Sequence, residues 1–236
     1  MDIAENIAAI RKRIAGACDR AGRDPDSVRL MGVSKAHPAK QVREAIDAGL
    51  KLLGENKVQE AKLKIPECPG GAKWHFIGHL QTNKVKDAVR FFDMLQCVDS
   101  LHLAEEINKR AEQAARTLPV LLEVNVAGEA SKFGYQPDQM LQELEALNDL
   151  PRLEIHGLMA IPPYVSNPEA ARPYFRRLAE LKRRCEDSFG TPLPELSMGM
   201  SGDFELAIEE GSTLVRVGTT IFGPRTFKSA QSKQET

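Results

Sequence analysis

Short apolar runs alternate along the chain with longer stretches in which apolar residues recur at a helical spacing. The short runs predict buried strands, and a period of about 3.6 residues predicts amphipathic helices between them. Because strand and helix alternate regularly, we expect parallel strands joined by right-handed crossovers. The predicted strands are residues 28–33, 52–54, 74–77, 94–98, 120–126, 153–159, 195–197 and 213–217.

Eight strand–helix units in succession predict a closed (β/α)8 TIM barrel. An open doubly wound sheet would carry G-x-G-x-x-G after its first strand, and residues 32–37 (Gly-Val-Ser-Lys-Ala-His) do not match that motif. Residues 2–21 precede the first strand and carry an apolar stripe, which predicts an extra N-terminal helix. We expect one barrel domain over residues 1–226 and a disordered tail over residues 227–236.

Composition narrows the class of protein. The formal net charge is −1, so no overall field attracts nucleic acid or an anionic membrane. No apolar run approaches the roughly 18 residues of a membrane span. The four cysteines are scattered without a C-x-x-C motif, which is typical of reduced thiols in a cytoplasmic protein. No metal site is expected, and we assign no chemistry to the four histidines that show no metal-ligand spacing, namely His37, His75, His102 and His156.

Polar and small residues follow several predicted strands, where the active face of such a barrel is built. Lys35, Asn56 and His79 follow the first three strands. The loops after strands seven and eight are the usual phosphate site. In the first of these loops Ser201 can cap the next helix, while the second offers Gly218 for close backbone approach and the hydroxyl of Thr219. Each loop alone is also explained as a helix cap or a tight turn.

Arg216 alternates with Val215 and Val217 on strand eight and is expected to point into the barrel. A buried guanidinium needs an acceptor, either a protein carboxylate or a ligand. Strand eight pairs with strand one once the barrel closes, which brings Lys35 beside the predicted phosphate site. A lysine amine near a phosphorylated ligand suggests a Schiff base to a carbonyl, with pyridoxal 5′-phosphate (PLP) as the candidate. A solvated lysine at a strand end is the alternative.

The chain resembles the pyridoxal phosphate homeostasis protein family, single-barrel relatives of the alanine racemase N-terminal domain. The resemblance runs from about Val28 to Arg225. It implies a barrel that holds PLP as a Schiff base on Lys35, with Arg216 facing the pyridine nitrogen. It places Ser201, Gly218 and Thr219 at the phosphate, and Asn56 and His79 near the ring. The motifs that carry it are residues 33–35 (VSK), 54–60 (GENKVQE), 74–84 (WHFIGHLQTNK), 157–159 (GLM), 196–203 (LSMGMSGD) and 215–223 (VRVGTTIFG).

Alanine racemase has a second, β-rich domain and a catalytic tyrosine supplied by its dimer partner. This chain ends about ten residues after the predicted barrel, so we expect neither feature within it and expect a monomer. An arginine opposite the pyridine nitrogen makes the ring a weak electron sink. The implied role is binding, buffering and delivery of PLP to PLP-dependent apoenzymes, without robust catalysis. The alternatives are a fold-type III amino-acid racemase of low activity, and a barrel isomerase or aldolase in which Lys35 attacks a sugar phosphate.

Overall fold

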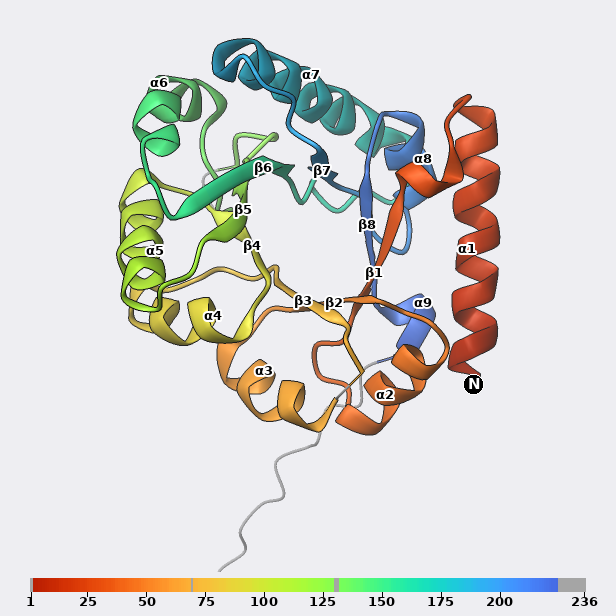
Figure 1. Ribbon diagram of the computed structural model, residues 1–236. Coiled ribbons are helices and arrows are strands. Elements are labelled where there is room, and N and C mark those ends of the chain that lie inside the picture. The colour runs from red at the N-terminus through yellow and green to blue at the C-terminus, as the bar shows by residue number, and fades with distance from the viewer. Residues whose placement is uncertain (1, 69, 130–131, 225–236) are drawn as a thin grey trace, which may run out of the picture.

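Eight parallel strands close into a barrel in chain order (Figure 1). The computed structural model describes residues 2–68, 70–129 and 132–224. β1 and β8 close the barrel, with Arg29 opposite Leu214 and Gly32 opposite Val217. This arrangement confirms the predicted (β/α)8 barrel. The strands are β1 (Arg29–Val33), β2 (Leu52–Glu55), β3 (Lys73–Phe76), β4 (Met94–Val98), β5 (Leu118–Glu123), β6 (Leu153–Met159), β7 (Glu195–Ser197) and β8 (Leu214–Val217).

Helices surround the barrel (Figure 1). Short 3₁₀ turns over residues 25–27, 65–67, 82–84 and 168–171 complete the connections. Among the described residues, no helix is both long enough and apolar enough to span a membrane. The helices are α1 (Ile3–Arg20), α2 (Ala39–Asp47), α3 (Val58–Lys64), α4 (Val85–Phe91), α5 (Leu101–Gln113), α6 (Pro137–Asn148), α7 (Arg172–Phe189), α8 (Phe204–Glu209) and α9 (Thr219–Phe222).

The predicted extra helix, α1, lies outside the junction between β1 and β8 (Figure 1). The Asp2 carboxylate accepts the amides of the first turn and so caps the helix. The buried stripe Ile3, Ile7, Ile10 and Ile14 faces α2, α8 and α9. The N-terminal helix therefore packs on both short helices that follow the last two strands.

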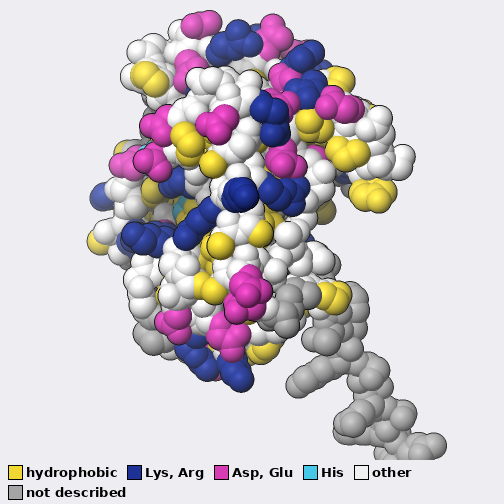
Figure 2. Space-filling model, turned by 90° about the vertical axis from the view of Figure 1, so that its right-hand side faces the viewer, with side chains coloured by type: hydrophobic (Ala, Val, Ile, Leu, Met, Phe, Trp, Pro, Cys, Tyr) yellow, Lys and Arg dark blue, Asp and Glu magenta, His cyan; other side chains and the backbone are white. Residues whose placement is uncertain are grey.

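Ion pairs connect the outer surface of α1 to α8. Arg13 pairs with Glu205 at 2.7 Å and Arg20 with Glu209 at 2.9 Å, both on α8. Figure 2 shows that basic and acidic side chains lie close together on this side of the molecule. The exposed charges on this side therefore partly neutralise one another.

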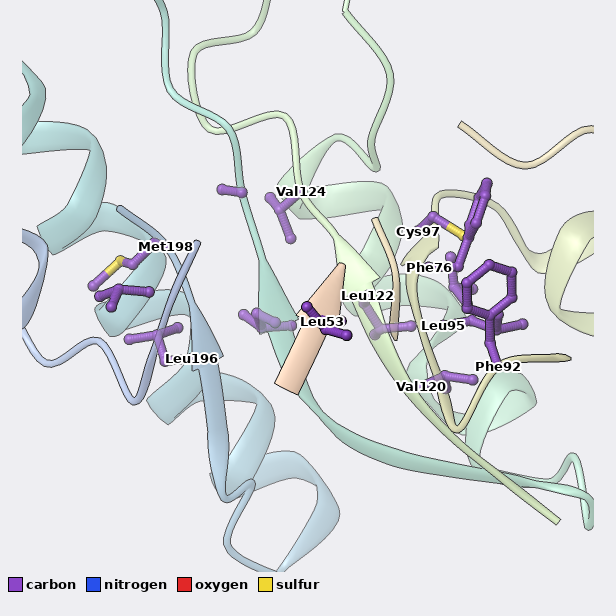
Figure 3. Close-up of a cluster of buried hydrophobic side chains, with 14 of the residues drawn as sticks. Leu53, Phe76, Phe92, Leu95, Cys97, Val120, Leu122, Val124, Leu196 and Met198 are labelled. Atoms are coloured by element: carbon purple, nitrogen blue, oxygen red, sulfur yellow. The ribbon is translucent and has the colours of Figure 1, made fainter. Parts of the chain in front are cut away.

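Side chains of each strand alternate between the helices and the barrel interior. Those facing the helices are mostly apolar, and Figure 3 shows Leu95, Val120 and Leu122 of neighbouring strands gathered beside Phe92. The interior carries two small apolar clusters, one of which comprises Met94, Leu121 and Met159. The other comprises Met31, Leu52 and Leu214.

The fifth strand differs from its predicted range, residues 120–126, because it ends at Glu123. Beyond that residue Val124 forms a bridge with Tyr135, whose amide donates to the Glu123 carbonyl at 2.7 Å. The chain thus pairs with its own returning loop and leaves the barrel. Gly134, at φ 109°, permits this approach, since a Cβ there would lie 2.7 Å from the Asn125 nitrogen.

The predicted domain boundary at residue 226 and the predicted disordered tail over residues 227–236 lie outside the described residues. Both stay predictions.

Candidate functional site

A cavity of about 780 Å³ opens among the loops that follow β1, β6, β7 and β8. This volume lies within the roughly 300–1,000 Å³ typical of small-molecule sites. Five of the seven predicted site residues line it, namely Lys35, Ser201, Arg216, Gly218 and Thr219. The far wall is the loop after β6, with Ile161–Ser166 and Pro168.

Lys35 stands in a turn two residues after the end of β1 and is half-buried. The Ser34 amide donates to the Gly54 carbonyl of β2 at 3.1 Å, which extends the sheet contact to the start of this turn. Ala36 adopts a left-handed conformation, φ 64°, and reverses the chain toward α2. The turn therefore presents the Lys35 side chain to the cavity.

The turn after β7 contributes one side of an anion-binding surface. Ser201 was expected to cap α8, and this is wrong: the N-cap position belongs to Asp203. The Asp203 carboxylate accepts the Met200 amide at 2.6 Å, because the turn folds back on itself before the helix begins. Within the described part of the chain, the amides of Ser201 and Gly202 donate no hydrogen bond, and both residues line the cavity.

Gly199 makes this turn possible. Its φ is 92°, and a Cβ at this position would lie 2.6 Å from the Cβ of Ala207. A larger residue would push α8 away from the strand end.

The turn after β8 supplies the other side. Gly218 is the N-cap residue of α9, where the first amides of a helix have no partner within it. A Cβ on Gly218 would lie 3.2 Å from the Val33 carbonyl oxygen, so glycine keeps β8 close to the end of β1. We call Ser201, Gly202, Gly218 and Thr219 the anion cradle.

Arg216 points into the barrel, as predicted, and only 3% of it is exposed. It donates to the Ser197 carbonyl at 2.8 Å, to Ser197 Oγ at 2.6 Å and to the Ala160 carbonyl at 2.8 Å. Among the described residues it forms no ion pair with a carboxylate. Within the described part of the chain, three of the five N–H donors of an arginine are thus used and two are not.

Burial lowers the pKa of Arg216 to about 10, and the nearby charges of Glu123 and Asp203 oppose this shift. At neutral pH the guanidinium is therefore still protonated. It can donate hydrogen bonds into the cavity but does not release a proton.

A buried polar chain continues from Arg216 across the barrel interior. Ser197 Oγ donates to Gln96 Oε1 at 2.7 Å, and Gln96 Nε2 lies 2.8 Å from His75 Nδ1. Burial lowers the pKa of His75 to about 3, so the ring is neutral and its Nδ1 accepts from the amide. The chain orients Ser197 and thereby the guanidinium of Arg216.

His79 and Asn56 lie outside the cavity lining. His79 is exposed, stacks on Phe133 with ring centroids 3.6 Å apart, and places Nδ1 3.4 Å from Asp99 Oδ2. It lines a second, more open pocket with Asp99 and Ser100. Asn56 is half-buried after β2, and its carbonyl oxygen would lie 2.4 Å from a Cβ on Gly78. Their roles near the ring stay predictions.

Two histidines that were assigned no role from the sequence belong to this site. His37 lines the cavity, is 6% exposed, and stacks on Phe222 with ring centroids 5.2 Å apart. Its place two residues after Lys35 is a signal that could have found it. His75 could have been found from its inward position on β3, but only with its neighbours on β4 and β7 known.

The donor set suits a small phosphorylated aldehyde. Backbone amides of the anion cradle suit a phosphate, the Lys35 amine suits a carbonyl carbon, and Arg216 offers two unused donors to a ring acceptor. Among the described residues, no three of the His, Cys, Asp and Glu side chains are grouped so as to hold a metal ion. These features together fit PLP.

The fold and the cavity define a class: a parallel barrel in which a lysine after the first strand faces an anion cradle after the last two. The chain belongs to the alanine racemase N-terminal domain family, whose model matches residues 4–226. This finding bears out the family resemblance expected from the sequence.

Relatives of known name align over almost the whole chain. It is 45% identical to the pyridoxal phosphate homeostasis protein of Aquifex aeolicus (strain VF5), over 96% of this chain and 100% of that protein. It is 42% identical to the protein of the same name from Escherichia coli (strain K12), over 96% and 98%. The structure of PipY from Synechococcus elongatus PCC7942 with PLP bound gives a TM-score of 0.83 at 37% identity, covering 94% of this chain and all of that one.

Proposed function

We propose that this protein binds PLP covalently through Lys35 and takes part in PLP homeostasis without robust turnover of its own. The observation that carries the proposal is the arrangement around one cavity of Lys35, the anion cradle and Arg216. The names of the relatives and the PLP bound to PipY support it.

Each part of the site has one task in this proposal. The anion cradle binds the phosphate through Ser201, Gly218, Thr219 and their backbone amides. The Lys35 amine attacks the aldehyde carbon, a C=N bond forms and one water leaves. When bound, PLP supplies an electron sink for amino-acid chemistry.

Arg216 limits how strongly that sink acts. It remains protonated at neutral pH and donates hydrogen bonds without transferring a proton, so a pyridine nitrogen facing it stays unprotonated. A weak electron sink favours holding the cofactor over turnover. The proposed role is thus storage, buffering and delivery of PLP to PLP-dependent apoenzymes, by a cytoplasmic monomer.

The test is the visible absorption spectrum after incubation with PLP and gel filtration. The native protein is expected to be yellow, whereas Lys35→Ala loses the band, because it removes the amine that follows β1, the strand that pairs with β8 and so lies beside the anion cradle. The matched control is Lys40→Ala, an exposed lysine on α2, which keeps the band. A colourless native protein, or a Lys35→Ala variant as yellow as the native one, would refute covalent binding at Lys35.

The racemase alternative is tested separately, by chiral chromatography of alanine and other amino acids at high protein concentration. The expected turnover lies well below about 1 s⁻¹, under the usual enzyme range. A higher turnover would show that the protein acts as a racemase and not as a carrier.

A further inference from the structure

Both peptide groups that flank Lys35 are hydrogen-bonded to one ion pair on α3. The Lys64 ammonium donates to the Ser34 carbonyl at 2.8 Å, before Lys35. The Ala36 amide, after Lys35, donates to Glu60 Oε1 at 2.7 Å. Glu60 and Lys64 pair with each other at 2.6 Å, one helical turn apart. The main chain of Lys35 is thus held from both sides by a single pair of side chains.

A second carboxylate extends this ion pair into the protein. Lys64 Nζ also donates to Glu55 Oε1 at 2.6 Å, and the same oxygen accepts from Ser34 Oγ at 2.6 Å. Lys64 is only 6% exposed and Glu55 is fully buried. A buried ammonium with three oxygen partners has little freedom to move. The hydrogen bond from Lys64 therefore holds the Ser34 carbonyl, and with it the start of the turn, in place.

The turn needs such support because of its backbone conformation. Ala36 has φ 64°, a region that an alanine rarely adopts since its Cβ crowds the following carbonyl. Residues held in this region persist only where surrounding contacts over-determine them, and they cluster at functional sites. Here the contact of the Ala36 amide with Glu60 supplies that constraint.

We infer that Glu60 and Lys64 are positioning residues that aim the Lys35 amine at the bound aldehyde. Neither residue lines the cavity, so they act through the peptide groups of Ser34 and Ala36. The inference rests on the proposed function, since it assigns the pair a task only if Lys35 forms the covalent bond. Covalent bonding to Lys35 and phosphate binding can then be tested separately, because the anion cradle lies on different elements, after β7 and β8.

The experiment compares two probes in Glu60→Gln and Glu60→Ala. PLP can bond to Lys35, whereas pyridoxine 5′-phosphate has the same phosphate and ring but no aldehyde. The rate at which the absorption band of bound PLP appears should fall by roughly tenfold to a hundredfold in Glu60→Ala, the loss expected when a reacting group is misplaced. Glu60→Gln should lose less, because its amide oxygen can still accept from Ala36. The dissociation constant of pyridoxine 5′-phosphate should stay within about twofold of the native value, since positioning affects only the covalent step.

The matched control is Glu186→Gln on α7. Glu186 pairs with Lys182 at 2.7 Å, one helical turn away, and accepts the Leu193 amide at 2.8 Å, so it repeats the chemistry of Glu60 far from the cavity. This variant should react with PLP at the native rate. The Glu60 side chain is 27% exposed, so its variants should fold, and thermal unfolding checks that they do.

Three outcomes would decide against the inference. Unchanged PLP kinetics in both Glu60 variants would show that the pair does not position Lys35. Equal weakening of PLP and pyridoxine 5′-phosphate binding, or equal loss in Glu186→Gln, would show a general effect on the fold. Failure of the native protein itself to react with PLP would instead overturn the proposed function, which the same measurement reveals.

Discussion

At the scale of single residues, the site depends on polar groups buried inside the barrel. Arg216 is desolvated, yet its charge faces carbonyl and hydroxyl oxygens in place of a carboxylate. From the sequence we expect a protein carboxylate or a ligand as its acceptor, and not the backbone carbonyls of Ser197 and Ala160. They could not be read from the sequence, because every residue type has a carbonyl and only the closed barrel shows which ones converge.

Ser197 links Arg216 to Gln96 and is fully buried, so its hydroxyl matters for stability. Ser197→Ala leaves the Gln96 oxygen without its donor and removes one acceptor from Arg216. We expect the free energy of unfolding to fall by about 1–3 kcal/mol, measured by urea unfolding. The control is Ser188→Ala, an exposed serine of α7, where a change within about 0.5 kcal/mol is expected. Equal losses for the two substitutions would show that the buried hydrogen bonds of Ser197 do not stabilise the fold.

His75 gives the fold a defined pH dependence. Its pKa is about 3 in the folded protein against 6.5 ordinarily, because burial disfavours the charged ring. Between these values the unfolded chain binds a proton that the folded chain does not, so this group makes stability rise with pH. Its contribution is complete above pH 6.5 and is lost as the pH falls toward 3.

The measurement is urea unfolding of the native protein and of His75→Gln over this pH range. The native protein should lose up to about 1.4 kcal/mol more per pH unit on acidification than the variant does. Burial raises the pKa of Glu123 to about 7, which acts in the opposite direction, but this contribution is common to both proteins. Parallel pH profiles would show that His75 is not buried as a neutral ring.

At the scale of elements, α1 is a structural part of the site, although none of its residues lines the cavity. It packs on α8 and α9, and Asn6 Nδ2 donates to the Ile221 carbonyl at 3.0 Å. Both α8 and α9 follow the two turns of the anion cradle. The apolar stripe of α1 could be predicted from its spacing. The helices that this stripe packs on could not, because they depend on where the barrel closes.

Ile10 lies in the middle of that stripe and is completely buried. Ile10→Ala should reduce the free energy of unfolding by about 2–5 kcal/mol, the loss typical of a large aliphatic side chain in a core. Urea unfolding measures it. Leu63→Ala on α3 is the matched control, because Leu63 is 76% exposed and its removal should cost less than about 0.5 kcal/mol. A small loss at Ile10 would mean that α1 packs only loosely on the barrel.

The limits of prediction also lie at this scale. The strands and helices could be predicted because apolar residues recur with a different period in each. The ends of these elements could not, because they are set by contacts between residues distant in sequence. β5 ends early because its chain pairs with Tyr135, and α8 begins at Phe204 because Asp203 folds back on Met200. In the sequence, Glu60 and Lys64 have only the i,i+4 spacing that is common to ion pairs on helix surfaces. Their contacts with Ser34 and Ala36 span 24 to 30 residues of sequence.

At the scale of the whole molecule, the predicted barrel is confirmed, and its closure brings five predicted site residues to one cavity. Strand order was predictable, because right-handed crossovers leave few alternatives. The wall after β6 was not, since Ile161–Ser166 is an irregular segment without a periodic pattern. The loop after β3 also lacks a periodic pattern. His79 could therefore be placed at the end of a strand, but the sequence could not show whether it lines the cavity.

Ligand binding should stabilise the whole barrel, because the site joins several of its loops. PLP at a hundred times its dissociation constant adds about 2.7 kcal/mol to the free energy of unfolding. For a chain of this length that raises the midpoint of thermal unfolding by roughly 5–10 °C. Differential scanning calorimetry with and without PLP measures the shift, and Lys35→Ala should show a smaller one. The absence of any shift in the native protein would contradict specific binding to the folded state.

The pairing of β1 with β8 has a consequence for how the protein is made. Lys35 emerges early from the ribosome, whereas Arg216 and Gly218 emerge among the last residues of the barrel. A growing chain therefore carries the reactive amine through most of its synthesis without the surface that recognises the phosphate. Synthesis adds residues from the N-terminus onward at about 5–20 per second, so the complete site exists only after β8 has docked. Under the proposed function, PLP is therefore expected to bind only to chains in which β8 has already docked.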